Sequence, residues 1–295
     1  MKFLFLILIG LSFEALGFDC SPRSLIEWKS VAKGLYWAKY DLAFTAYDKD
    51  LRRWSTERNR NATVRAFKIN LSLNKLLLHT APQSLSCTPG RDRYITQLIK
   101  DQNLNALAAI NASFFVMPNG GILGLALDEN KLWSGNLENL NKVSAGVFTI
   151  SDKAVNLVPK KEFVTQHGTI FTHAQAAQFQ FAIEAYPQLL NGGELLIDDS
   201  VLNSRRARTS IGKALDSNEI ILVTIDARGE TNETGATLFE YAHMLKTEAC
   251  GVSQSIALNL DGGGSSAFAI PSQDIAEQAE DCRNLGNILT IHPLK

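Results

Sequence analysis

The residues best suited to chemistry lie toward the C-terminal end of the chain, where an acidic residue is followed by three glycines. Asp261 precedes Gly262, Gly263 and Gly264, and Ser265 follows them. Glycines leave backbone N–H groups uncovered and accept positive φ angles, so consecutive glycines can form a concave nest that binds an anion. The alternative is a tight turn in which Asp261 and Ser265 cap their own backbone. The pattern therefore indicates either an anion site with a carboxylate at its edge or a structural turn.

Two catalytic motifs that use glycine do not fit this stretch. It lacks the Gly-Lys-Ser/Thr ending and the following helix of a Walker loop. Ala267 stands where a nucleophile elbow has a glycine, and the residues from Phe268 onward are typical of a strand rather than of a helix.

A second carboxylate, Glu240, lies in the clearest helical pattern of the chain. Residues 237–250 repeat apolar side chains at helical spacing, and Gly251 follows, as glycine often does after a helix. Thr237 and Glu240 fit a capping box, in which Glu240 binds backbone N–H groups. The other interpretation is a carboxylate that is held at the start of a helix pointing at the site, and the two are compatible. His243 completes a single Glu-x-x-His spacing; a dimetal bundle needs two, so we interpret His243 as an ordinary helix residue.

Arg205, Arg206 and Arg208 lead into a predicted strand over residues 208–213. Guanidinium groups bind phosphate in bidentate fashion. We interpret Arg205 and Arg206 as solvated charges. Arg208 alternates with Ser210, so both lie on one strand face, and that face could line a cleft.

The elements that must position these residues are mostly strands. Alternating or apolar runs predict strands at 42–47, 64–69 (with one wet face), 107–111, 122–127, 131–133, 145–150, 154–158, 208–213, 220–225, 256–260, 267–270 and 287–291. Helical spacing predicts helices at 93–102, 173–185 and 237–250. Strands at hairpin spacing with interspersed helices indicate an α+β fold of mixed, largely antiparallel sheets with two or three packed helices.

The N-terminus has the pattern of a secretory signal peptide. Lys2 is followed by an apolar run, and Ala15 and Gly17 are small residues at the −3 and −1 positions of a cleavage site, which would make Phe18 the first mature residue. The expected organisation is a signal peptide at 1–17 and a mature protein from 18 onward. The expected location is the bacterial periplasm or the exterior.

Export makes the four cysteines interpretable. An even number of widely spaced cysteines in an oxidising compartment suggests two disulfides with three alternative pairings. The preferred pairing is Cys20 with Cys87 and Cys250 with Cys282. No paired spacing suggests a zinc site.

Overall composition excludes two classes of partner. The 29 Lys and Arg residues nearly balance the 30 Asp and Glu residues, so no long-range electrostatic field favours binding to nucleic acid. After the N-terminus no stretch is long and apolar enough to span a bilayer. No oligomeric state is predicted.

Taken in series, several short motifs resemble the phosphodiester glycosidase family. The motifs are Asn111 with Phe114-Phe115, residues 187–192 (Pro-Gln-Leu-Leu-Asn-Gly), 208–212 (Arg-Thr-Ser-Ile-Gly), 237–240 (Thr-Leu-Phe-Glu) and 259–265 (Asn-Leu-Asp-Gly-Gly-Gly-Ser). The last is the specific one. The resemblance runs from about Leu107 to Ile291, so we expect a glycosidase-like domain at 107–295 and an N-terminal part at 18–106 that the resemblance does not cover. Ala112 and Tyr186 stand where the family often has glycine, so the resemblance leaves the substrate open.

The resemblance implies a hydrolase that cleaves the bond between an anomeric carbon and a phosphodiester. Such a reaction passes through an oxocarbenium-like state that carboxylates stabilise, so Asp261 and Glu240 are the expected catalytic residues. Asn111, Arg208, Thr209, Gly262, Gly263, Gly264 and Ser265 are the expected substrate-binding residues, and the ligand is a carbohydrate or sugar phosphate. No cofactor is expected, and metal dependence is left open. A non-catalytic binder of anionic glycans is the alternative function, and an esterase with Ser265 as nucleophile is a weaker third.

Overall fold

The structure is a computed structural model, and it describes residues 17–57, 60–81, 94–116, 121–129, 131–140, 142–152, 154–200, 204–226, 235–279 and 284–294. The expected signal peptide, up to residue 16, lies outside the described residues, and so do Cys87 and Cys282.

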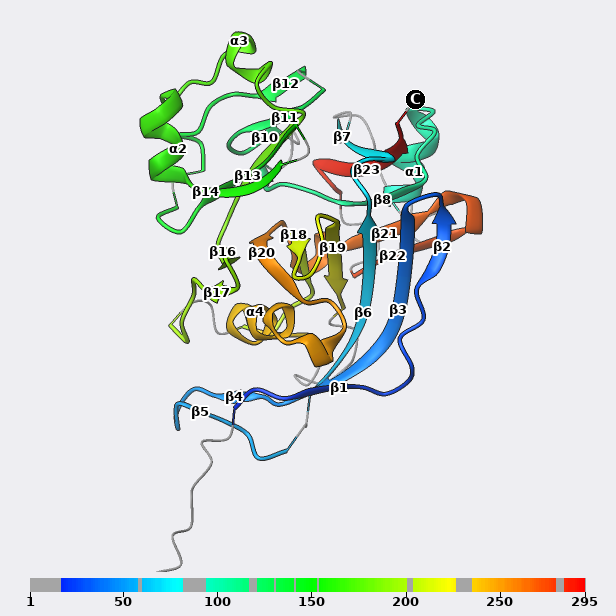
Figure 1. Ribbon diagram of the computed structural model, residues 1–295, viewed down its shortest axis with the longest axis vertical. Helices are drawn as coiled ribbons and strands as arrows, with labels where there is room; N and C mark the ends of the chain where they lie inside the picture. The colour runs from blue at the N-terminus through cyan, green and yellow to red at the C-terminus, as the bar shows by residue number, and fades with distance from the viewer. Residues whose placement is uncertain are drawn as a thin grey trace, which may run out of the picture.

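The largest sheet is antiparallel and lies at the centre of the molecule (Figure 1). Its order is β1 (Cys20–Pro22), β3 (Leu35–Phe44), β6 (Arg60–Ile69), β19 (Ile220–Ile225), β18 (Arg208–Ala214), β20 (Gln254–Asn259), β16 (Gln188–Asn191) and β17 (Glu194–Leu195), and β2 (Lys29–Ala32) pairs with β3. Strands far apart in sequence are therefore neighbours, and the N-terminal segment forms one half of the sheet.

Two five-stranded antiparallel sheets lie over one end of the large sheet (Figure 1). The first has the order β22 (Ile275–Gln278), β21 (Ala267–Ile270), β8 (Ala108–Asn111), β23 (Asn287–Pro293) and β7 (Asn74–Thr80). The second has the order β12 (Lys131–Ser134), β11 (Ala126–Asp128), β15 (Phe181–Ala185), β13 (Gly146–Ser151) and β14 (Ala154–Pro159). Short hairpins join β4 (Tyr47–Asp48) to β5 (Arg53–Trp54) and β9 (Phe115–Val116) to β10 (Gly121–Ile122).

The described part contains four α-helices. They are α1 (Tyr94–Asp101), α2 (Lys160–His167), α3 (His173–Ala176) and α4 (Leu238–Lys246). None of the helices described is both long and apolar enough to cross a membrane. The expected α+β class is compatible with this architecture, which is richer in strand than a balanced α+β fold.

The large sheet is covered on both faces. On one face Val64 and Ala66 of β6 share a core with Leu238 and Tyr241 of α4. On the other face Phe67 stacks on Phe268 of β21, with ring centroids 4.2 Å apart. The wet face predicted for residues 64–69 is therefore wrong, because β6 is an inner strand between two cores.

The helix predicted at 173–185 is also wrong. Only His173–Ala176 is helical, with a capping box between Thr172 and Gln175, and Phe181–Ala185 forms the fully buried strand β15. Alanine and glutamine favour helix locally, but β15 lies between β11 and β13 and buries both faces, and such tertiary burial overrides propensity. The helix predicted at 237–250 ends earlier, at Lys246, and a 3₁₀ turn over Glu248–Cys250 follows it.

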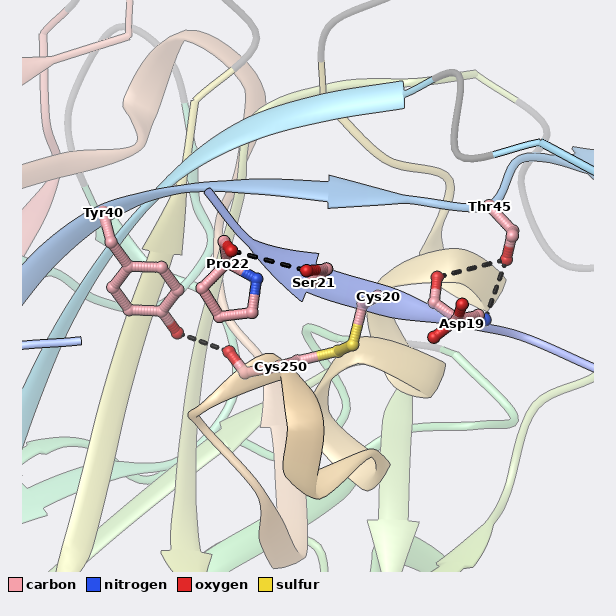
Figure 2. The surroundings of a disulfide bond; sticks show 7 residues. All are labelled: Asp19, Cys20, Ser21, Pro22, Tyr40, Thr45 and Cys250. Atoms are coloured by element: carbon pink, nitrogen blue, oxygen red, sulfur yellow. Dashed lines mark hydrogen bonds between the residues drawn. A yellow bond between two sulfur atoms is a disulfide. The ribbon is translucent and has the colours of Figure 1, made fainter. Parts of the chain in front are cut away.

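One disulfide joins Cys20 to Cys250, with their Cα atoms 5.6 Å apart (Figure 2). The predicted pairing of Cys20 with Cys87 and of Cys250 with Cys282 is therefore wrong. Strand β1 lies beside the 3₁₀ turn that follows α4, and the Tyr40 hydroxyl donates to the Cys250 carbonyl at 2.6 Å. The bridge closes a separation of 230 residues, which sequence spacing could not reveal.

Candidate functional site

The glycine stretch is a tight turn between an inner strand of the large sheet and β21 of a smaller sheet. The Asp261 carboxylate accepts from the Gly262 N–H at 3.0 Å, and Gly263 donates to the Ala207 carbonyl at 2.8 Å. A Cβ on Gly262 would lie 3.0 Å from that carbonyl oxygen, and Gly263 has a φ of +60°, so both positions favour glycine. Two of the three glycine N–H groups expected to form an anion nest are thus bound within the protein. Asp261 itself is partly exposed.

Asn111 is the hub that holds this turn. Its amide nitrogen donates to the Asp261 carbonyl at 2.6 Å, and its amide oxygen accepts from the Thr209 hydroxyl at 2.9 Å and from the Ala267 N–H at 3.0 Å. The Thr209 hydroxyl also lies 3.1 Å from that of Ser266. Asn111 is 1% exposed and Thr209 is fully buried. The structure therefore brings together three of the predicted site residues: Asn111 of β8, Thr209 of β18 and Asp261 of the glycine turn. Asn111 and Thr209 are the two that hold the turn in position.

Glu240 forms the predicted capping box and has further partners. Its carboxylate accepts from the N–H groups of Thr237 and Tyr47, each at 2.9 Å, and pairs with Arg205 at 2.6 Å. The side chain is fully buried, and the Arg205 side chain is only 21% exposed. The prediction that Arg205 is a solvated charge is therefore wrong. The buried carboxylate joins the start of α4 to the β4 segment, and its predicted catalytic role stays a prediction.

Arg208 lies on the α4 side of the large sheet. Its guanidinium donates to the carbonyls of Ala236 at 2.9 Å and Ser204 at 2.7 Å, and burial lowers its pKa to about 10. Ser210 shares this face and lies 2.8 Å from the Tyr241 hydroxyl. This strand face packs against α4, so the cleft expected along Arg208 and Ser210 is not formed there. Phosphate binding by Arg208 stays a prediction.

Ser265 is the last residue of the 3₁₀ turn Gly263–Ser265 and is 1% exposed. A nucleophile must reach its substrate, and this burial gives a substrate little access to the Ser265 hydroxyl. The geometry therefore favours a structural role for Ser265 over the esterase alternative.

Sequence reasoning missed a charged network beside the hub. Thr209, Thr224 and Arg65 are direct cross-strand neighbours, so their side chains share one face of the sheet. Arg65 is 5% exposed and binds both Asp226 and Glu277. Burial opposes ionisation of Glu277, but hydrogen bonds from Arg65 and Lys39 outweigh it and lower the pKa of Glu277 to about 2. The sequence did contain a signal for this network: Arg65 is two residues from Phe67 in an apolar strand, so the charged and the aromatic side chain must share one face of the sheet.

An aromatic pair flanks the other side of the turn; both residues were named from the sequence, but their pairing was not predicted. Phe114 and Tyr186 stack with ring centroids 4.7 Å apart, and both are partly exposed. The Tyr186 carbonyl accepts from the Asn259 amide at 2.8 Å, and Asp261 donates its N–H to the Ala112 carbonyl at 3.1 Å. These bonds place the aromatic pair next to the segment that carries Asp261.

Among the residues described, no group of three or more His, Cys, Asp and Glu side chains is arranged to hold a metal ion.

Comparison with known proteins gives one family and a shared fold. A family model described as phosphodiester glycosidase matches residues 104–292. The zebrafish N-acetylglucosamine-1-phosphodiester α-N-acetylglucosaminidase catalytic domain, auto-inhibited by its pro-peptide, is similar at a TM-score of 0.61 with 19% identity, over 94% of this chain and 88% of that one. A hypothetical protein from Synechocystis is similar at a TM-score of 0.57 with 16% identity, over 94% of this chain and 68% of that one. An exported-protein candidate from Burkholderia pseudomallei K96243 is similar at a TM-score of 0.51 with 13% identity, over 94% of this chain and 97% of that one. At these identities the structures show the fold alone, and no curated protein matches the sequence.

Proposed function

The chain belongs to the phosphodiester glycosidase family, and from that premise we propose that it is an exported hydrolase that cleaves a sugar-1-phosphodiester linkage in an envelope glycan or a related glycoconjugate. The observation that carries the proposal is the convergence of Asn111, Thr209 and Asp261 within the segment that the family model matches. The side chains of Asn111 and Thr209 meet each other and, through Asn111, the Asp261 backbone at one turn, which fixes the position of Asp261 as a site with fixed geometry requires.

Asp261 is the carboxylate best placed to meet a substrate. It is partly exposed, and its backbone is bound on both sides, by the Ala112 carbonyl and by the Asn111 amide. A carboxylate held in this way can stabilise the positive charge that develops at an anomeric carbon without first reorganising. Glu240 is buried behind Arg205, so we assign it a supporting role at the start of α4.

The leaving group is a phosphodiester, which departs as a stable anion and needs little protonation. Its negative charge still needs stabilisation, and guanidinium groups bind phosphate well. Arg208 is the arginine proposed for this, because its Cα lies 3.8 Å from the position that a Cβ on Gly262 of the turn would take. Phe114 and Tyr186 offer aromatic faces to the sugar on the other side of the turn.

Two observations support export. A disulfide joins Cys20 to Cys250, and disulfides persist mainly in oxidising compartments. The N-terminal pattern of a signal peptide agrees with this location.

The test compares Asp261→Asn with the wild-type protein on a sugar-1-phosphodiester. Asparagine can still accept from the Gly262 N–H, so the melting temperature should be unchanged. Turnover should fall by roughly 10²–10³-fold if the carboxylate stabilises transition-state charge. Asp216→Asn, at an exposed position in the turn between β18 and β19, is the matched control.

Three outcomes are decisive. If turnover falls less than about tenfold with normal melting, Asp261 is not catalytic. If the wild-type protein binds the sugar phosphodiester without turning it over, the non-catalytic binder of anionic glycans is correct. If Asp261→Asn melts at a lower temperature and turnover falls only as far as the unfolded fraction explains, Asp261 supports the turn alone.

A further inference from the structure

An open pocket of about 440 Å³ lies between the β4–β5 hairpin and the start of α4. Its volume falls in the range of small-molecule sites. In Figure 1 the hairpin lies beyond α4, at the end of the large sheet. We call this cavity the β4–β5 pocket. Most of its lining comes from residues 46–60, and the rest from Asp199, Arg205, Thr237 and Phe239.

One wall of the β4–β5 pocket is aromatic. Trp54 stacks on Phe239 with ring centroids 5.4 Å apart and an interplanar angle of 8°. Tyr47 meets both rings edge-on, at 5.0 Å from Trp54 and 4.9 Å from Phe239. The three side chains fix one another, so they present a rigid apolar surface of the kind that ligand sites use to hold a ring.

The rest of the lining is charged, with an excess of positive charge. Four basic side chains (Lys49, Arg53, Arg60 and Arg205) and two acidic ones (Asp48 and Asp199) line the pocket. Arg205 pairs with Glu240, and Asp199 accepts from Arg52 and from the Tyr47 hydroxyl. Arg52 and Glu240 are the salt-bridge partners of Asp199 and Arg205, so they belong to the same charge count. With them included, the described residues at the pocket have two more basic groups than acidic groups. This excess favours an anionic ligand.

The β4–β5 pocket adjoins the glycine turn. Arg205 lines the pocket, and two residues further on the Ala207 carbonyl accepts from the Gly263 N–H at 2.8 Å. Two residues of extended chain span about 7 Å. Glu240, behind Arg205, also bonds to the Tyr47 N–H of the hairpin. A ligand in the pocket can therefore reach toward the turn that carries Asp261.

We propose that the β4–β5 pocket binds a phosphorylated sugar unit of the substrate, with the ring against Trp54 and Tyr47 and the anion near Arg53 and Lys49. The inference rests on the proposed function for the identity of the substrate and extends it by a second subsite. Most of this subsite comes from the N-terminal segment, outside residues 104–292, which the family model matches. Substrate choice in this chain is then set largely by residues outside the segment that the family model matches.

The probe is α-D-glucose 1-phosphate, titrated by calorimetry against the wild-type protein and variants, with glucose and inorganic phosphate as partial ligands. Lys49→Ala/Arg53→Ala should weaken binding by about tenfold or more, as the loss of a charge-assisted hydrogen bond does. Trp54→Leu should weaken glucose 1-phosphate but leave inorganic phosphate unchanged, because only the ring uses the aromatic wall. Lys161→Ala, an exposed cation on α2, is the matched control and should bind as the wild type does.

The possible outcomes distinguish the ligand-binding proposal for the pocket from the proposal that the protein is a glycosidase. No binding by the wild type at millimolar probe, or equal binding by Lys49→Ala/Arg53→Ala, overturns the pocket. Inorganic phosphate that binds as tightly as glucose 1-phosphate overturns the sugar part of the proposal. Binding that depends on Arg53, in a protein without turnover, supports the pocket and rejects the hydrolase. Turnover that depends on Asp261, with binding unaffected by Arg53, supports the hydrolase and rejects the pocket.

Discussion

Asn111 is the residue whose loss should have the largest effect on the glycine turn. Truncation to alanine removes three hydrogen bonds at once: the donor to the Asp261 carbonyl and the acceptor for Thr209 and Ala267. The side chain is 1% exposed, so bulk water does not replace these bonds. The Ala267 N–H would be left buried without a partner, and the Asp261 carbonyl would lose the amide that holds it.

The magnitude follows from the number of bonds. A typical buried hydrogen bond contributes about 1 kcal/mol net, so Asn111→Ala should lower the free energy of unfolding by about 3 kcal/mol. In a domain of this size that corresponds to a drop in melting temperature of roughly 6–12 °C. Asp261 should lose its fixed position, so turnover of a sugar-1-phosphodiester should fall by about tenfold or more, because small misplacements of reacting groups are costly.

The assay pairs urea titration with turnover for Asn111→Ala, Thr209→Val and a control. Thr209→Val keeps the bonds from Asn111 to Asp261 and Ala267, so it should cost less than Asn111→Ala. Ser255→Ala removes only long contacts, at 3.3 and 3.5 Å, from the other end of β20, and should change neither quantity. If Asn111→Ala lost less than about 1 kcal/mol, the hub would not hold the turn and the argument would fail.

Three further predictions concern the disulfide, the buried carboxylate and pH. Replacing Cys20 and Cys250 together by serine should lower the free energy of unfolding by roughly 2–5 kcal/mol, because the bridge closes a very long loop; identical urea curves for reduced and oxidised protein would contradict this. Glu240→Gln should cost roughly 2 kcal/mol or more, since Arg205 loses its partner inside the protein; normal melting with lost turnover would instead make Glu240 catalytic. Burial lowers the pKa of both His79 and His243 from 6.5 to about 4, so the unfolded state binds more protons between these values. Stability should be complete above pH 6.5 and fall as the pH drops toward 4, and a His79→Gln variant should show a smaller fall by urea titration.

The sequence determined the features that depend on neighbouring residues. Residues 256–270 were predicted as strand, glycine turn and strand, and the structure has β20, the turn and β21 in that order. The capping box of Thr237 and Glu240 was predicted from a spacing of three residues and is present. Turn and cap chemistry acts within a few residues, so the local sequence contains it.

Tertiary structure decided which predicted site residues meet and which face each one uses. Asn111 and Thr209 are 98 residues apart and touch only because β8 lies over the large sheet where β18 begins. Arg208 points to the α4 side of β18, where Ala214 shares a core with Leu238, while Ile211 on the opposite face shares a core with Phe268. Both faces of the strand are buried, so no alternation pattern distinguishes them. Residues 181–185 became a strand because they pair with β11 and β13 on both sides. The partner of Cys20 was set by the position of β1 beside the end of α4. In each case the deciding contact joins distant segments, so its free energy is absent from any local window of the sequence.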